Sequence, residues 1–379
     1  MCGGVAARST RCCHLPDAAV RLRCCSAYPV TAAIGIPDVP AAHVFGTWSS
    51  TYTDPMGICI CGITALEVYR ASGRLLPDVL ARPRTATLDV GPPPSATMLA
   101  DDLTRLGART TPYHLAIDSA HRIAPRPDIQ RHSFREPFPR KAFIRLSPKI
   151  SLVSPEFLFV KLSAAGDLDE IDLALIGYEL CGLYVLDPDD ESWTGQISTG
   201  ASLTNALKID RMIQACGGRR GIARARSAAG LIADRSNSPM ETVLAALFGF
   251  PRRLGGLGLG PIEMNRKVAT TTGDRWVDLF FVGKGVGLEY KGREAHSIEK
   301  VGRDDRRQNK LVGSGVAVLN VWYEDLADAN LFDQLVHDVC NALGVRLRIR
   351  SKTFDHRQAL LRRRLMPAIG RFGGMAPMR

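Results

Sequence analysis

The sequence predicts an α/β protein whose C-terminal part holds a mixed sheet, with elements in the order α-β-β-β-α-β. Three observations favour this fold class. An apolar helix opens at Ser238–Glu241, two strand-like runs at Trp276–Val282 and Gly285–Tyr290 flank a short turn, and the apolar strand Val316–Trp322 follows a charged helix. We expect a smaller α/β domain and a helical segment to precede this sheet.

Composition and patterning divide the chain into five expected segments. They are a disordered or mis-started extension at 1–40, a small α/β domain at 41–150, a helical segment at 151–235, the domain with the mixed sheet at 236–345 and a basic tail at 346–379. Residues 1–40 are rich in Ala, Cys, Arg and Pro and lack sustained periodicity, as terminal extensions often do. An acid-poor, Arg-containing N-terminus is also compatible with a transit peptide.

The first 235 residues combine short strand patterns with helical ones. The expected elements are a short helix over Cys59–Tyr69, strands over Arg84–Val90 and Ala142–Leu146, and helices from Pro155 and over Asp167–Cys181, Ser202–Ala215 and Arg219–Ala233. Proline is favoured in a first helical turn and glycine directly after a helix, which fits Pro155 and Gly182.

The C-terminal domain is expected to start its sheet with a strand over Arg266–Thr271 that turns at Gly273-Asp274. A closing helix over Asp328–Leu343 carries one apolar face, expected to consist of Leu331, Leu335, Val339 and Leu343.

Charge and hydropathy narrow the classes of function. The chain has 379 residues, 45% hydrophobic and 23% charged, as an ordinary globular protein of two or three domains has. No apolar run approaches the length of a transmembrane helix, so we expect no membrane span. The net charge is +11, and residues 346–379 contain ten Arg and Lys against the single acid Asp355. Such a tail favours attraction to nucleic-acid phosphates, although a merely solvated tail has the same composition.

The ten cysteines do not predict a metal site. No CxxC pair and no His pair with zinc-ligand spacing accompanies the adjacent cysteines at 12, 13, 24 and 25. Without a convincing secretory signal, reduced thiols in the cytoplasm are the expectation.

The central hairpin places two carboxylates opposite one another. Gly283-Lys284 fits a two-residue turn with glycine first, which pairs Val282 with Gly285. The same register sets Asp278 directly across from Glu289, and Lys291 projects from that same face. Facing carboxylates repel each other unless a cation lies between them. Mg²⁺ or Mn²⁺ is therefore the expected cofactor, because hard divalent cations take carboxylate oxygens and keep water ligands.

These residues resemble a nuclease family. The order of a helix with Glu241, strands with Asp278 and Glu289-Tyr-Lys291, a basic helix and a last strand is similar to the PD-(D/E)XK nuclease superfamily. Asp278-Leu, Glu289-Tyr-Lys-Gly, His296 and Asp304-x-x-Arg307-x-x-x-Leu-x-x-x-Gly315 are similar, more closely, to the endonuclease-like domains related to very-short-patch-repair (Vsr) enzymes. The resemblance covers residues 236 to 325 and implies a restriction-endonuclease-like fold. Many Vsr-like members carry Asp where Lys291 stands.

The resemblance also implies a role for each residue. Glu241, Asp278 and Glu289 would hold Mg²⁺ or Mn²⁺, a metal-bound water would attack phosphorus, and Lys291 would stabilise the developing charge. His296 would serve acid–base chemistry. Four side chains of the basic helix are expected to contact DNA phosphates: Arg303, Arg306, Arg307 and Lys310.

Each of these residues also has a structural interpretation. Asp278 would form a salt bridge with Lys291, which would then only neutralise the carboxylates. Glu241 completes a capping box with Ser238. His296 would be an ordinary loop histidine, and Asp304 and Arg307 would form a surface ion pair.

The expected function is a Mg²⁺-dependent DNA endonuclease, in DNA repair or phage defence. The N-terminal part offers an alternative. Thr64-Ala65-Leu66 in a short helix, followed by strands and by Ile150–Pro155 before a helix, is similar to the C-terminal domain of AbiEi-type antitoxins. A non-cleaving, DNA-binding regulatory protein of that type is the first alternative, although no winged helix precedes this segment. An RNA nuclease is the second.

Overall fold

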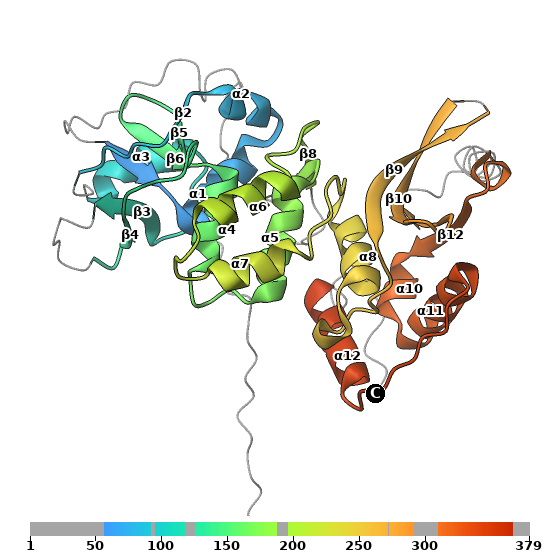
Figure 1. The fold of residues 1–379 in the computed structure, drawn as a ribbon. Helices are drawn as coiled ribbons and strands as arrows, with labels where there is room; N and C mark the ends of the chain where they lie inside the picture. Colours follow the sequence, from blue (N-terminus) through green and yellow to red (C-terminus); the bar gives the residue numbers. More distant parts are fainter. Residues whose placement is uncertain are drawn as a thin grey trace, which may run out of the picture. The chain divides into compact units, whose positions relative to one another are not determined.

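The computed structural model (Figure 1) describes residues 57–91, 95–118, 126–187, 196–271, 273–291 and 310–366. All of them belong to the compact unit Ala41–Arg379. The expected extension at 1–40 and the expected helix around Arg307 lie outside the described residues.

The N-terminal sheet has six strands in the order β2-β5-β6-β1-β3-β4. The strands are β1 Ile58–Ile60, β2 Arg84–Thr85, β3 Tyr113–Asp118, β4 Ile129–Phe134, β5 Phe143–Arg145 and β6 Ile150–Val153. The sheet is mixed, because β1 is parallel to β6 and antiparallel to β3, while β3 and β4 run parallel. The helices that accompany it are α1 Gly62–Ser72, α2 Leu76–Ala81 and α3 Ala96–Arg105, with a 3₁₀ turn at Gly73–Leu75.

A helical segment follows the sheet (Figure 1). It contains α4 Pro155–Ser163, α5 Glu170–Cys181, the small hairpin β7 Tyr184–Leu186 and β8 Gln196–Ser198, α6 Ala206–Ala215 and α7 Ile222–Ala229. Side-chain oxygens that accept from free backbone amides set the starts of the first two helices. Ser154 caps α4, which begins at Pro155 as expected. Asp169 caps α5, which therefore begins at Glu170, three residues after the expected start at Asp167.

The C-terminal sheet has four strands in the order β12-β11-β10-β9. The elements are α8 Pro239–Gly249, a 3₁₀ turn at Arg252–Leu254, β9 Ile262–Thr270, β10 Gly273–Phe281, β11 Val286–Lys291, β12 Ala317–Trp322, α10 Tyr323–Ala327, α11 Ala329–Leu343 and α12 Phe354–Leu365. β9, β10 and β11 are antiparallel neighbours, and β12 lies parallel to β11. The α/β class with mixed sheets is therefore confirmed.

Two hydrophobic clusters enclose this second sheet. Leu279, Phe281 and Leu288 contribute to the larger cluster, together with residues of α8, α11 and α12. Val277 and Phe280 contribute to the smaller one with Leu311, Val316 and Val318. Neighbouring side chains of a strand point to opposite faces, so the alternation of residues 279, 280 and 281 assigns the clusters to opposite faces of the sheet.

Several element boundaries differ from expectation. Cys59–Tyr69 was expected to be one helix, but Ile58–Ile60 is a buried strand and the helix begins only at Gly62. The expected strand Arg84–Val90 shortens to Arg84–Thr85, with Val90 making a single bridge to Gly57. β9 begins at Ile262, four residues before Arg266. Pairing with segments more than 50 residues away decides the boundaries of Ile58–Ile60 and Arg84–Thr85, and pairing with β10 extends β9 to Ile262.

The expected two-residue turn at Gly283-Lys284 is wider than predicted. Strand pairing ends at Phe281 and Val286, so four residues form the turn. The amide of Val282 donates to Pro261, and the carbonyl of Gly285 accepts from Ala317. Because these two backbone groups bond to segments outside the hairpin, they do not pair with each other.

The apolar face of α11 also differs at one position. Leu335, Val339 and Leu343 are buried as expected, whereas Leu331 is 38% exposed and Phe332 occupies the core in its place. Helical spacing places either residue 331 or residue 332 on the same face as residues 335 and 339. Phe332 takes the buried position because its aromatic ring buries more surface than the Leu331 side chain would.

Candidate active site

The hairpin holds the predicted register. Leu279 pairs with Leu288, Phe280 with Gly287 and Phe281 with Val286. The pairing ends at Leu279 and Leu288, so the predicted pair of Asp278 and Glu289 lies one position beyond the observed ladder. Gly287 permits the close pairing, because a Cβ there would lie 2.4 Å from Cγ1 of Val277.

Asp278 lies at a break in the sheet. β9 and β10 pair continuously from Ile262 to Thr270 except at Asn265, the residue opposite Asp278. Asn265 has a left-handed backbone with φ of +46°. Val277 and Leu279 would share one face of a regular strand, yet they pack in different clusters. The side-chain alternation of β10 therefore reverses at Asp278, which turns this carboxylate out of the regular ladder.

Glu241 lies in the first turn of α8 and is only 7% exposed. Its Oε2 accepts hydrogen bonds from the backbone amide of Asn237, at 2.8 Å, and from the side-chain amide of Asn265, at 2.6 Å. Ser238 donates its hydroxyl to Oε1 at 3.2 Å and caps the helix by accepting from the backbone amide of Glu241. The expected cap is present, with the difference that the Glu241 carboxylate bonds to the amide of residue 237.

Asn265 connects these groups. One amide hydrogen goes to Glu241, and a second goes to the carbonyl of Arg235 at 2.9 Å. The Oδ1 atom accepts from Asn237 at 2.6 Å. All three polar contacts are made by a side chain that is 4% exposed, so Asn265 holds the Glu241 carboxylate in place. The sequence analysis missed this residue. Its one local signal is that asparagine tolerates a left-handed backbone inside a strand.

Burial and a neighbouring charge raise the pKa of Glu241 to about 7. Removal of the carboxylate from water has the larger effect, and the negative charge of Asp278 adds to it. The hydrogen bonds from Asn237, Asn265 and Ser238 act in the opposite direction. The charge of Asp278 on β10 therefore acts on Glu241 of α8, although the two residues lie on different elements.

Glu289 and Lys291 form the next part of the site. The ammonium of Lys291 lies 3.0 Å from Oε2 of Glu289, and both side chains are largely buried. The backbone amide of Tyr290, between them, donates to Oδ2 of Asp278 at 2.9 Å. The hairpin thus brings Asp278, Glu289 and Lys291 together, with the lysine on the same side as Glu289, as the register predicts.

The other expected site residues are placed only in part. His296, Arg303, Arg306 and Arg307 lie outside the described residues. Lys310 begins a described helical stretch that runs to Gly313.

The carboxylates have donor chemistry that suits a hard cation. Mg²⁺ binds through one or two protein carboxylates and completes its shell with water and substrate phosphate. Within the described part of the chain, no three His, Cys, Asp or Glu side chains are grouped closely enough to hold a metal ion. The pair of Glu241 and Asp278 fits a two-carboxylate site, because a bound cation would offset the repulsion that raises the Glu241 pKa.

Comparison of the chain with protein-family models, with curated proteins and with solved structures returned no match. Of the described helices, none has the length and apolar character that crossing a membrane requires.

Proposed function

We propose that residues 236–345 form a Mg²⁺- or Mn²⁺-dependent DNA endonuclease with a restriction-endonuclease-like, Vsr-related fold. The observation that carries the proposal is the break in the ladder between β9 and β10 at Asn265 and Asp278, where the side chain of Asn265 holds the buried carboxylate of Glu241. Interruptions of a strand ladder are over-represented next to active sites, and buried carboxylates with perturbed ionisation are candidates for functional residues.

Each residue has a distinct task in the proposed reaction. Asp278 and Glu241 would hold the cation, which when bound would supply an activated water and stabilise negative charge on the phosphate. The expected third ligand, Glu289, is not grouped with them closely enough to complete a three-residue metal site. Lys291, whose ammonium lies 3.0 Å from Oε2 of Glu289, would donate a hydrogen bond to an oxygen of that phosphate. Asn265 keeps Glu241 oriented through its amide.

We also propose that the protein acts in the cytoplasm. All five cysteines within the described residues, Cys59, Cys61, Cys181, Cys216 and Cys340, are buried free thiols. Free thiols suit the reducing cytoplasm, where DNA repair and phage defence take place.

A second function is supported by a separate observation. Lys291 already pairs with Glu289, and no three-ligand group occurs among the described residues. A fold that binds DNA without cleaving it would show the same arrangement. The N-terminal resemblance to AbiEi-type antitoxins points to a regulatory protein of that kind.

The deciding experiment incubates the full chain with plasmid DNA, single-stranded DNA and RNA in Mg²⁺, Mn²⁺ or EDTA. The test variant is Glu289→Gln, which removes one charge from the site. The matched control is Glu263→Gln, because Glu263 is an exposed carboxylate on the neighbouring strand β9. Circular dichroism verifies that both variants fold.

We expect metal-dependent cleavage of DNA by the wild type and by Glu263→Gln, and a loss of at least about 100-fold in Glu289→Gln, as for removal of one transition-state contact. Equal rates in the two variants would refute the assignment. DNA binding without cleavage in any metal would favour the regulatory function, and cleavage of RNA alone would identify an RNA nuclease.

A further inference from the structure

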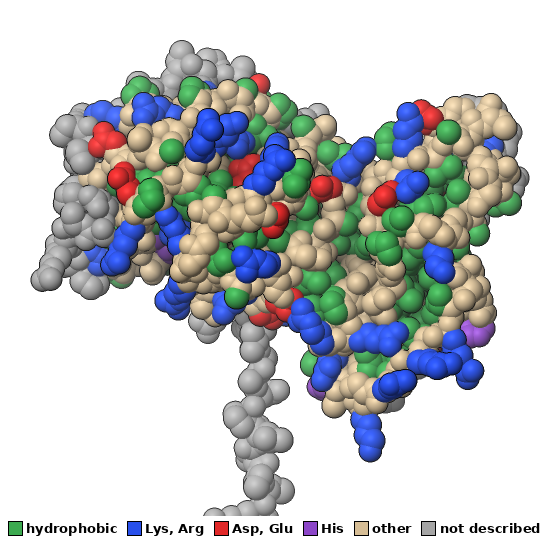
Figure 2. Space-filling view, in the orientation of Figure 1, with side chains coloured by type: hydrophobic (Ala, Val, Ile, Leu, Met, Phe, Trp, Pro, Cys, Tyr) green, Lys and Arg blue, Asp and Glu red, His purple; other side chains and the backbone are tan. Residues whose placement is uncertain are grey.

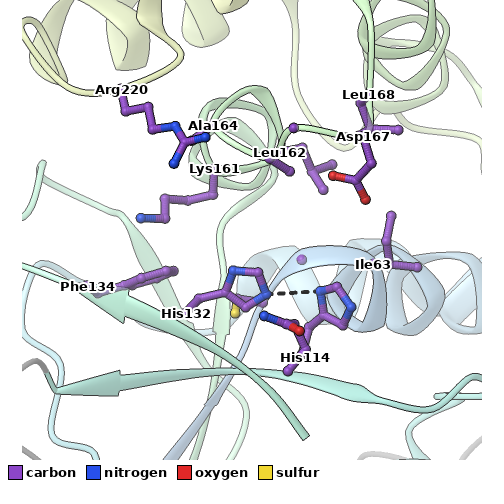
Figure 3. A pocket seen from close by; sticks show the side chains of 15 residues that line it. Ile63, His114, His132, Phe134, Lys161, Leu162, Ala164, Asp167, Leu168 and Arg220 are labelled. Atoms are coloured by element: carbon purple, nitrogen blue, oxygen red, sulfur yellow. Dashed lines mark hydrogen bonds between the residues drawn. The ribbon is translucent and has the colours of Figure 1, made fainter. Parts of the chain in front are cut away.

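A cavity in the N-terminal half is independent of the carboxylate site. It measures about 430 Å³ and is lined by residues of α1, β3, β4 and α4, the loop that follows α4, and Arg220. That volume lies in the range of small-molecule sites. Figure 3 shows charged side chains at two ends of this cavity and a histidine pair on the strands below.

One end of the cavity is basic. Lys161 and Arg220 extend into the same space from α4 and from the segment before α7 (Figure 3). Among the described residues, Lys161 has no carboxylate within salt-bridge distance. Its ammonium lies 3.8 Å from the ring centroid of Phe134 instead. Burial lowers the pKa of Lys161, because the ammonium loses water without gaining a counter-ion. An anion bound here would restore that balance.

The histidine pair on the strands is polar but uncharged near neutral pH. Nε2 of His132 lies 3.0 Å from Nδ1 of His114, so one ring donates to the other. Burial, followed by the neighbouring His114, lowers the pKa of His132 to about 4, and burial lowers the pKa of His114 as well. In a complex, the histidines would therefore offer hydrogen-bonding groups to a ligand without adding positive charge.

The other end of the cavity is acidic. Asp167 lies in the loop after α4, on the side away from Lys161 and Arg220 (Figure 3). A ligand that spans the cavity would meet cations at one end and a hydrogen-bond acceptor at the other.

The one thiol that lines the cavity is not a nucleophile. Cys61 is fully buried, and burial raises its pKa far above the ordinary range, so the thiol stays protonated. The cavity thus has the groups of a binding site and lacks an activated catalytic one.

We propose that this cavity binds a small phosphate monoester, with Lys161 and Arg220 on the phosphate and Asp167 accepting a hydrogen bond from an amino group at the other end. A dianionic phosphate matches two cations from separate elements, and an arginine fork suits its oxygens. An amino-bearing mononucleotide has the required groups at its two ends. The proposal does not rest on nuclease activity.

Titration calorimetry on the full chain tests the proposal with three probes: AMP, IMP (which lacks the amino group) and inorganic phosphate. The variant Lys161→Met keeps the aliphatic stem and removes the charge. Arg211→Gln is the control, because Arg211 is exposed on α6 and does not line the cavity. Thermal melting verifies that both variants fold.

We expect the wild type and Arg211→Gln to bind AMP more tightly than IMP, and Lys161→Met to bind AMP at least 10-fold more weakly. Asp167→Asn should remove the preference for AMP and leave the affinity for inorganic phosphate unchanged. The proposal is wrong if the wild type binds none of the three probes, or if Lys161→Met binds AMP as the wild type does. Equal losses for AMP and IMP in Asp167→Asn would overturn the role of Asp167.

Discussion

Asn265 combines two properties that a single residue seldom has inside a strand. Its backbone is left-handed, which interrupts the ladder, and its side-chain amide fixes Glu241. Asparagine suits both tasks, because it tolerates positive φ better than most residues and offers both a donor and an acceptor. The geometry of the site therefore depends on a residue that carries no charge.

Substitutions at Asn265 separate the backbone from the side chain. Asn265→Gly and Asn265→Ala both lose the hydrogen bonds, which should cost about 1–3 kcal/mol because buried partners remain unsatisfied. Alanine should cost about 1 kcal/mol more than glycine, since only glycine adopts the left-handed backbone without strain. Urea denaturation measures both values. Equal stability of the two variants would show that the backbone relaxes at this position.

The raised pKa of Glu241 predicts a pH dependence of stability. The pKa rises from its ordinary value of 4.5 to about 7, so the folded protein holds this proton more tightly than the unfolded chain. The stabilisation is fully present below pH 4.5 and is lost as the pH rises towards 7. The glutamine of Glu241→Gln cannot ionise. As the pH rises from 4.5 to 7, the free energy of unfolding of this variant should therefore increase relative to that of wild type, by roughly 3 kcal/mol at most.

Denaturation of both proteins at several pH values between 4 and 8 measures this difference. Glu263→Gln serves as the control, because an exposed carboxylate should give a profile parallel to wild type. A parallel profile for Glu241→Gln would contradict the raised pKa. If Glu241 contacts the cation, added Mg²⁺ should reduce the loss of wild-type stability at high pH.

At the scale of elements, the sequence predicts what depends on alternation and misses what depends on long-range pairing. The hairpin register follows from two alternating runs around one turn, and it is confirmed from the pair Phe281–Val286 to the pair Leu279–Leu288. The sequence does not predict the break in the ladder at Asn265, because the break depends on residues of other elements: Asp278 lies opposite Asn265, and Glu241 accepts its hydrogen bond. The strand Ile58–Ile60 is likewise decided by neighbours more than 50 residues away.

Part of the basic tail has a structural task. α12 buries Phe354 and Leu361 in the C-terminal core. Arg362 donates to the carbonyls of Leu326 and Ala327, at 2.8 to 3.0 Å, and its guanidinium lies 4.7 Å from the centroid of Phe332. Those carbonyls end α10, where the helix itself supplies no partner.

Arg362→Met should therefore destabilise the protein by about 2 kcal/mol, the scale of hydrogen bonds from a charged donor. Arg363→Met removes the same charge from the next residue, which is exposed, and should have little effect. Thermal melting compares the two. Similar melting temperatures for both variants would mean that the contacts of Arg362 contribute nothing to stability.

At the scale of the whole molecule, positive charge is unevenly distributed. The chain carries a net charge of +11, and basic side chains gather over the C-terminal helices in Figure 2. Arg346, Arg348 and Arg350 are exposed in the segment between α11 and α12. An exposed cluster of this kind attracts phosphates to the part of the chain that carries the carboxylate site.

If these three arginines contact DNA phosphates, changing them together to glutamine should weaken binding to all sequences alike. Each contact contributes about 0.9 to the slope of log K against log salt for duplex DNA, so the slope should become shallower by up to about 2.7. Fluorescence anisotropy with a labelled duplex at several salt concentrations measures this slope.

A control must remove the same charge from elsewhere, since any loss of +3 weakens general attraction to DNA. Arg135, Arg140 and Arg145 are exposed in the N-terminal half, and their joint change to glutamine gives an equal net charge. Long-range attraction alone would change both slopes equally, whereas direct phosphate contact would change only the slope of the C-terminal variant. Equal slopes in the two variants would therefore exclude the segment at 346–350 as part of a DNA-binding surface.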